Sequence, residues 1–241
     1  MSHTLLLIPT DVERRWAGAL VDKLLRRAQV ELCGFGPIVA GIRTTQHIAQ
    51  HRPERVLLVG IAGAINAELP MGKAYEFDQV ACYGIGGGCG SNFQTASELG
   101  WHQWSSESPD SGIPSVDDTI PLSPVDKMAS ENSRLLLTVC AASANAADVA
   151  RHRVKFPQAL AEDMEGFSVA AACRLARVPF VHRAGFRMWP VIANISIGNR
   201  LPPCKLPFTW LWLCWTSRHR AVRSSLWSLR LCVSKTEYWQ E

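Results

Sequence analysis

The sequence lacks the cysteine spacings that hold metals or staple small secreted domains. It has 241 residues and eight cysteines, but no two of them are spaced as C-x-x-C. Such scattered cysteines indicate neither a zinc site nor a disulfide framework. Reduced thiols are typical of the cytosol. We therefore expect no metal, no other cofactor and a cytoplasmic location.

Long hydrophobic runs are also missing. The apolar run at residues 5–8 is short and ends at Pro9, so it does not read as a signal peptide. The apolar stretch at residues 206–215 has about half of the ~20 residues that a helix needs to span a bilayer. We expect no membrane partner.

Acidic residues are scarce at the C-terminal end. No Asp or Glu stands between Glu165 and Glu237, and residues 183–241 hold nine Lys or Arg, two acids and six of the nine tryptophans. The net charge of +4 therefore belongs to this tail, and residues 1–182 carry −3. A basic charge confined to one aberrant tail does not indicate a nucleic-acid partner. We interpret residues 1–181 as the domain and residues 182–241 as a tail that is not natively structured.

The first 181 residues alternate apolar runs with helical patterns, at a length that suits one domain. The patterns predict strands at residues 4–8, 30–33, 55–59 and 177–181, and helices at residues 12–28, 37–51 and 167–175. Continuous apolar strands separated by helices indicate an α/β fold in which a parallel or mixed sheet is covered on both faces. Active sites of such sheets gather at the strand ends.

Three loops near predicted strand ends carry candidate chemistry. Pro9-Thr-Asp-Val-Glu13 follows the first strand, although its two acids also suit an ordinary helix start. Gly34-Phe-Gly36-Pro and Gly60-Ile-Ala-Gly63 let the backbone approach a ligand and leave N–H groups free. Neither is a G-x-G-x-x-G or Walker loop, and tight turns are the alternative interpretation.

Two further segments add candidate residues. The glycine-rich residues 84–91 lead to Phe93 and are either a flexible loop or a wall that closes over a base. Met164-Glu165 stands at the head of a small-residue helix. A buried carboxylate there needs a partner, such as a ligand hydroxyl. An ordinary acid of the first helical turn is the alternative.

Together these motifs resemble one enzyme family. Pro-Thr-x-x-Glu, Gly-Phe-Gly-Pro, Val-Leu-Leu-Val-Gly-Ile-Ala-Gly-Ala, Glu-Leu-Gly-Trp-x-Gln-Trp and Ala-Glu-Asp-Met-Glu-Gly-Phe are similar to futalosine hydrolases of the alternative menaquinone pathway. More broadly they resemble the purine nucleosidase and nucleoside phosphorylase superfamily. The resemblance covers about residues 4–181. It implies a single-domain, three-layer α/β/α fold around a central mixed sheet.

The resemblance also implies an activity, which is hydrolysis of the N-glycosidic bond of futalosine to release hypoxanthine. Glu165 would grip ribose hydroxyls, Met164 would pack under the sugar, and Glu13 would order the attacking water. Gly60, Ile61, Ala62 and Gly63 would line the sugar and base site, and Phe93 is a further candidate contact. A homo-oligomer without cofactor is expected. Methylthioadenosine/S-adenosylhomocysteine nucleosidase, phosphorylase and inactive nucleoside-binding protein are the alternatives.

The chain departs from the family after residue 181. The family pattern Val-Arg-Gly-Ile-Ser-Asp supplies the acid that protonates the leaving base, but this chain has His182-Arg-Ala-Gly-Phe-Arg-Met-Trp-Pro190. With suitable codons, residues 182–185 in another frame read Ile-Val-Arg-Gly, and residues 186–198 in a different one begin Ser-Asp-Val-Ala-Gly-Asp-Arg. We interpret the tail as frameshifted, with a divergent natural C-terminus as the alternative, and expect impaired activity.

Overall fold

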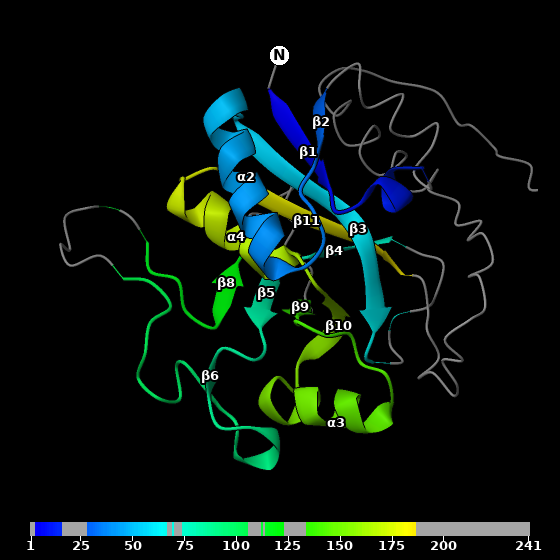
Figure 1. The fold of residues 1–241 in the computed structure, drawn as a ribbon, viewed down its shortest axis with the longest axis vertical. Helices are drawn as coiled ribbons and strands as arrows, with labels where there is room; N and C mark the ends of the chain where they lie inside the picture. The colour runs from blue at the N-terminus through cyan, green and yellow to red at the C-terminus, as the bar shows by residue number, and fades with distance from the viewer. Residues whose placement is uncertain are drawn as a thin grey trace, which may run out of the picture.

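The computed structural model describes residues 3–15, 28–66, 69, 74–105, 112, 114–122 and 134–186, the last four of these by their backbone alone. Two helices, α2 (Pro37–His51) and α4 (Gly166–Leu175), lie side by side on one side of a mixed sheet, and α3 (Ala146–Lys155) lies at its lower end in Figure 1. Most of the tail that we interpret as frameshifted, residues 187–241, lies outside the described residues.

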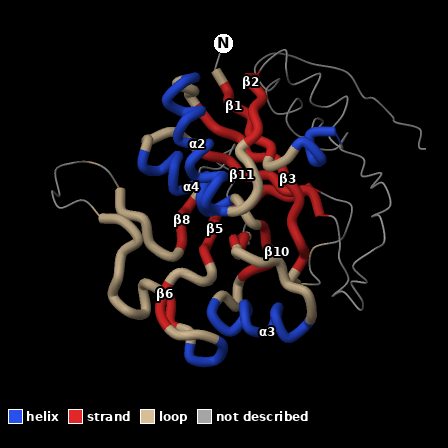
Figure 2. Tube along the Cα trace, viewed as in Figure 1, coloured by secondary structure: helices blue, strands red, loops and turns tan. Residues whose placement is uncertain are grey.

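The described part of the chain forms a nine-stranded sheet (Figure 2). Its strands are β1 (Thr4–Ile8), β2 (Ala28–Leu32), β3 (Arg55–Ala64), β4 (Ala74–Phe77), β5 (Gln79–Cys82), β8 (Thr119–Pro121), β9 (Leu135–Thr138), β10 (Ala159–Asp163) and β11 (Phe180–Phe186). The main order is β2-β1-β3-β10-β9-β5-β8, and β11 pairs with β3 and β4. A separate short hairpin joins β6 (Gly86–Gly87) to β7 (Gln94–Thr95) around the 3-10 turn η1 (Gly90–Asn92).

The sheet is mixed because β3 changes partners along its length. Its first half pairs in parallel with β1, and β11 runs parallel to it as far as Ala62. Its last two residues, Gly63 and Ala64, pair antiparallel with β10. The β3 strand therefore links the two halves of the sheet, and its residues 60–62 pair with the last three residues of β11.

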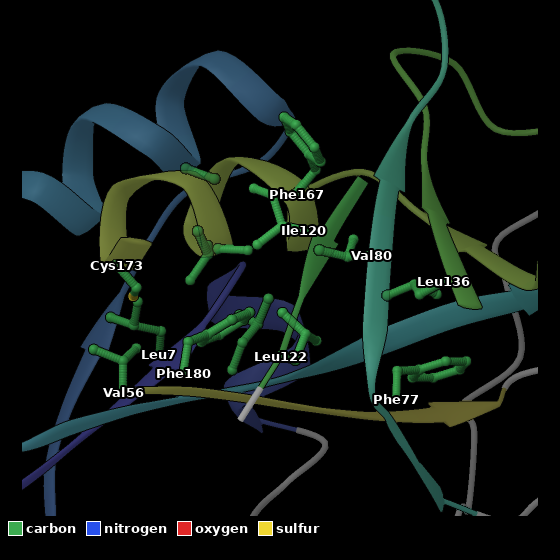
Figure 3. Close-up of a cluster of buried hydrophobic side chains, with 14 of the residues drawn as sticks. Leu7, Val56, Phe77, Val80, Ile120, Leu122, Leu136, Phe167, Cys173 and Phe180 are labelled. Atoms are coloured by element: carbon green, nitrogen blue, oxygen red, sulfur yellow. The ribbon is translucent and has the colours of Figure 1, made fainter. Parts of the chain in front are cut away.

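Alternation of side chains along the strands explains the three layers. Leu136 packs in a cluster with Phe167 and Cys173 of α4, on the face shown in Figure 3. Its neighbours Leu135 and Leu137 pack instead with Val149 of α3. Successive strand residues point to opposite faces, so α2 and α4 cover one face and α3 packs on the other at its β9 and β10 end. This confirms the predicted α/β/α layering and mixed sheet.

Several element boundaries differ from the predictions. Residues 4–8 and 37–51 form the predicted strand and helix, but Ala28, predicted as the end of a helix, begins β2 by pairing with Thr4. Residues 11–15 are helical, and the rest of that predicted helix lies outside the described residues. Residues 60–63, predicted as a loop, belong to β3, because backbone bonds to β11 and β10 continue the strand.

Two helix starts bring backbone N–H groups to the strand ends. Gly36 precedes α2 with a φ of 81°, a conformation that glycine adopts without strain, and Pro37 occupies the first helical turn. Glu165 precedes α4 as its N-cap residue.

Within the described chain, no helix has the length and hydropathy needed to cross a bilayer.

Candidate active site

Glu13 is held at the end of β1 by one local and one distant donor. The Thr10 hydroxyl donates to Glu13 Oε2 at 2.6 Å, and the Ile61 N–H of β3 donates to Oε1 at 3.1 Å. Burial raises the pKa of Glu13, whereas these two donors oppose the rise. Both oxygens are thus directed by hydrogen bonds, which fixes the carboxylate beside β3.

Glu165 is buried at the start of α4. Its Oε1 accepts a hydrogen bond of 2.8 Å from the Gly36 N–H, which comes from the turn between β2 and α2. Burial, and then the neighbouring Asp163 carboxylate, raise the pKa of Glu165 to about 8. A carboxylate with so high a pKa is poised to gain from new donors, such as the hydroxyls of a sugar.

Asp163 ends β10 and ties that strand to α4. Its Oδ1 accepts from the Thr138 hydroxyl at 2.6 Å, and its Oδ2 accepts from the Gly166 N–H at 2.7 Å. The Phe167 N–H in turn donates to Thr138 Oγ1 at 2.8 Å. Burial raises the pKa of Asp163 to about 7. This network satisfies the first N–H groups of α4 and thereby fixes the position of Glu165.

Cys33 lies within the field of both candidate carboxylates. Burial raises the pKa of its thiol, and the charges of Glu165 and Glu13 raise it further. The turn that carries Cys33 is bound to the end of β1, since its N–H donates to the Ile8 carbonyl at 3.0 Å. The structure therefore brings Glu13 and Glu165 to one region, and it keeps the nearby thiol protonated and unreactive.

His182 on β11 is buried beside Asp163 and Gly166. Its Nε2 lies 3.7 Å from Asp163 Oδ2, and a Cβ on Gly166 would meet its ring at 3.1 Å. Burial lowers the pKa of His182 to about 3, so the ring is neutral. The residue packs between Phe77 and Phe180. Although His182 opens the predicted aberrant tail, it occupies a fully buried strand position.

A second polar cluster lies on the other face of β10. The Glu162 carboxylate accepts from the Ser143 N–H and hydroxyl, each at 2.7 Å, and lies 3.2 Å from His152 Nδ1. The Tyr83 ring packs on His152 with centroids 4.5 Å apart, and Phe93 packs on Tyr83 at 4.9 Å. Phe93 therefore belongs to this aromatic group on the α3 face.

The remaining predicted residues lie in different parts of the structure. Ile61 binds Glu13 through its N–H, and a Cβ on Gly60 would lie 3.3 Å from Glu13 Oε1. Ala62 is buried in the core, and Gly63 lies beside Glu162. Met164 packs against the buried cluster on the α3 face, which Tyr83 also borders. The predicted set thus divides among the carboxylate region, the core and the cluster around Glu162.

Sequence reasoning missed the residues that bind the two acids at the end of β10 and so fix the start of α4. Asp163 lies two residues before Glu165, between a strand and a helix. An acid at this position stabilises the N-terminus of the helix, so Asp163 could have been predicted from the sequence. Thr138 and Ser143 gave no such signal, because their partners Asp163 and Glu162 lie about twenty residues away in the sequence.

Comparison with solved structures shows which fold this is. The 5'-methylthioadenosine/S-adenosylhomocysteine nucleosidase of Neisseria meningitidis matches with a TM-score of 0.58 and 15% identity, over 77% of this chain and 85% of that one. The native futalosine hydrolase of Helicobacter pylori matches with a TM-score of 0.57 and 15% identity, over 78% and 84%. The chain therefore has the fold of nucleosidases of the nucleoside phosphorylase type.

A third match binds a purine base. The corresponding nucleosidase of Colwellia psychrerythraea, in complex with adenine, has a TM-score of 0.58 and 17% identity, over 78% of this chain and 82% of that one. No protein-family model and no curated protein matches the chain. At these identities the likeness concerns the fold, and the activity has to be argued from the site.

Proposed function

We propose that the protein is a nucleosidase that hydrolyses the N-glycosidic bond of a purine nucleoside, with futalosine as the substrate. The observation that carries the proposal is the pair of directed carboxylates: Glu165 held by the Gly36 N–H and Glu13 held by the Ile61 N–H. The two carboxylates come from segments that are far apart in the sequence, and both lie near Cys33. The fold shared with solved nucleosidases supports this proposal.

The chemistry suits these two groups. Cleavage of the bond between the sugar C1′ and the base nitrogen builds positive charge on the ribose ring. A carboxylate at the ribose hydroxyls, Glu165, stabilises that charge. Glu13 takes a proton from the attacking water, whose oxygen bonds to C1′ while the bond to the base breaks. Met164 would pack under the sugar, and residues 60–63 would line the base and sugar.

The leaving base needs a proton, and this chain lacks the acid that the family pattern provides. Asp163 is a poor substitute, because both of its oxygens already accept hydrogen bonds that hold α4. Loss of one acid from a concerted site removes a factor of about 10²–10⁴ in rate. We propose that this chain binds the nucleoside and hydrolyses it slowly.

The register of β11 supports a frame change as the source of this loss. In the alternative frame, the serine and aspartate of the family pattern take the places of Phe186 and Arg187. Phe186 is paired with Ala62 of β3, next to the Ile61 N–H that holds Glu13. The restored aspartate would directly follow this strand end. Resequencing the coding DNA across codons 178–200 tests the idea, and a confirmed frame would exclude it.

The substrate and reaction are tested together by following base release. The protein is incubated with futalosine, methylthioadenosine or inosine, with and without phosphate. Hypoxanthine release from futalosine alone, independent of phosphate, is the expected result. Faster release of adenine from methylthioadenosine would favour the alternative nucleosidase, and dependence on phosphate would favour a phosphorylase. Binding of futalosine without any turnover would identify an inactive nucleoside-binding protein.

We also propose a homo-oligomer formed through the exposed apolar start of α2. Phe35, Ile38 and Ile42 are 65%, 77% and 56% exposed, and they flank the turn whose Gly36 holds Glu165. Burial of such side chains against a second copy would shield the site from water. Light scattering of the Ile38→Glu variant, which should lower the molecular mass to that of one chain, tests the interface.

A further inference from the structure

Two histidines of α2 and one glutamate of β2 lie together at the edge of the sheet. Glu31, His47 and His51 each present a ligand atom, and these atoms all lie within 4.8 Å of one another. His47 and His51 are four residues apart, so they share one face of the helix. β2 is the outermost strand of the main sheet order. This cluster is separate from the carboxylates Glu13 and Glu165.

The ring of His47 is held in the orientation of a metal ligand. It is 3% exposed, and its Nε2 lies 3.2 Å from the Leu32 carbonyl oxygen. The Leu32 carbonyl only accepts, and the Arg43 guanidinium, also 3.2 Å from Nε2, only donates. Metal binding at Nδ1 therefore uses the tautomer in which the Nε2–H donates to Leu32 and the lone pair is on Nδ1. Nδ1 is buried and has no hydrogen-bond partner among the described residues. Metal-binding histidines typically donate their other ring N–H to a carbonyl or carboxylate in this way.

His51 and Glu31 complete the group. His51 Nε2 lies 3.3 Å from Glu31 Oε1, yet this buried nitrogen makes no hydrogen bond within the described part of the chain. The His47 and His51 rings stack with centroids 5.8 Å apart. Gln29 Nε2 donates to Glu31 Oε1 at 2.8 Å and so steadies the carboxylate. Two buried ring nitrogens without partners are costly unless something binds them.

We propose that Glu31, His47 and His51 bind a divalent transition-metal ion, with Zn²⁺ as the best fit. Two imidazoles and a carboxylate are a donor set that Zn²⁺ takes, and water completes its tetrahedron. Small side-chain movements bring the three atoms to about 2.0–2.2 Å from the ion. The Arg43 guanidinium, 3.2 Å from His47 Nε2, opposes the cation, whereas the Glu31 carboxylate attracts it.

The ion would clamp the last turn of α2 to the edge strand β2. The same helix begins at Pro37, next to the Gly36 N–H that holds Glu165. The role of the ion is therefore structural. It steadies α2, whose other end positions Glu165 of the candidate site. The proposal stands independently of the substrate, because metal binding is measured without any nucleoside.

Co²⁺ titration of the full chain tests the site, since Co²⁺ takes the same ligands as Zn²⁺ and absorbs visible light. We expect visible d–d bands without the near-ultraviolet charge-transfer band that thiolate ligands give, and Zn²⁺ should abolish the spectrum. His51→Gln and Glu31→Gln should each weaken Co²⁺ binding by at least about tenfold. His102→Gln, at an exposed histidine paired with Asp117, should leave it unchanged.

Two results would overturn the proposal. A thiolate band would show that some of the eight cysteines take the metal instead. Affinity unchanged in both His51→Gln and Glu31→Gln would show that the ion binds elsewhere. Circular dichroism confirms that the variants fold. Arg43→Gln provides a gain-of-function check: removal of the opposing charge should tighten Co²⁺ binding.

Discussion

Glu13 and Glu165 each accept a hydrogen bond from a backbone N–H of a distant segment, but they differ in their other neighbours. Glu13 also accepts a hydroxyl from Thr10, three residues away. Glu165 has a second carboxylate, Asp163, as its neighbour, and its N–H donor is 129 residues distant. One carboxylate is therefore positioned mainly by its own turn. The other depends on the correct packing of α2 against α4.

Under the proposed function, this difference suits the two carboxylates to different tasks. Burial and the Asp163 carboxylate raise the pKa of Glu165, so hydroxyl donors from a ligand would stabilise its ionised form. Glu13 already has a hydroxyl and an N–H, which suits a group that must stay ionised to accept a proton from water. Substitutions at or beside each carboxylate, and the pH dependence of stability, test this assignment.

The largest effect is expected from Glu165→Gln. An amide keeps the shape but cannot ionise, so it loses the negative charge that hydrogen bonds from ribose hydroxyls would favour on Glu165 as the ribose cation develops. We expect nucleoside affinity to fall severely and the rate of base release to fall by about 10²–10⁴-fold. Isothermal titration with futalosine and assays of hypoxanthine release measure the two effects.

Glu98→Gln is the matched control for this substitution. Glu98 makes the same change from carboxylate to amide, but it is exposed and bound to Lys155. The control should keep the parent's affinity and rate. If Glu165→Gln binds futalosine as well as the parent does, the role assigned to Glu165 is wrong.

A smaller loss is expected from Gly60→Ala. The added Cβ would lie 3.1 Å from Pro9 Cγ and 3.3 Å from Glu13 Oε1. It would push Glu13 out of line with the Ile61 N–H, and we expect about a tenfold loss in rate, below the roughly 100-fold that a 1 Å displacement can cause. Gly41→Ala is the control, because its Cβ would make ordinary contacts at 3.5 Å or more. Equal rates for both variants would contradict the placement of Glu13.

The pH dependence of stability sharpens the contrast further. The pKa values of Glu165 and Asp163 are about 8 and about 7, above their unfolded values of 4.5 and 3.8. As pH rises between these limits, the unfolded chain loses its protons first, so the folded state binds more protons. The free energy of unfolding should therefore fall from about pH 4 to pH 8.

Urea denaturation at pH 5 and pH 8 measures this fall. Glu165→Gln has no ionisable group at that position, so its stability should decline less over the same interval. A parent protein that gains stability between pH 5 and pH 8 would contradict the raised pKa values.

The features that were predictable from sequence are the local ones. Pro9-Thr10 followed by Glu13 gave both the helix start and a candidate acid, and the continuous apolar run at residues 4–8 gave β1. The Gly36 donor was foreseen only as a free N–H group, because its partner Glu165 is fixed by tertiary packing. The extension of β3 through residues 60–63 was missed, since glycines there suggested a loop while the pairing strands β10 and β11 lie far along the chain.

The smallest effect is expected from Thr10→Val, which removes the local donor of Glu13 and leaves the distant one in place. The lost hydroxyl favoured the ionised carboxylate, so the pKa of Glu13 should rise further above its ordinary value. Below that pKa a larger share of Glu13 is protonated and unable to accept a proton, so base release should slow a few-fold near pH 6. The rate should recover as pH rises.

Thr10→Ser separates this effect from a loss of folding. Serine keeps the hydroxyl that donates to Glu13 Oε2 and accepts from the Glu13 N–H, so its pH profile should match that of the parent. Valine also removes the helix cap, at a cost of about 1 kcal/mol in unfolding free energy, but that loss does not shift a pH profile. A shifted profile in Thr10→Val alone would show that the turn tunes Glu13, and identical profiles in all three proteins would show that the Ile61 N–H suffices.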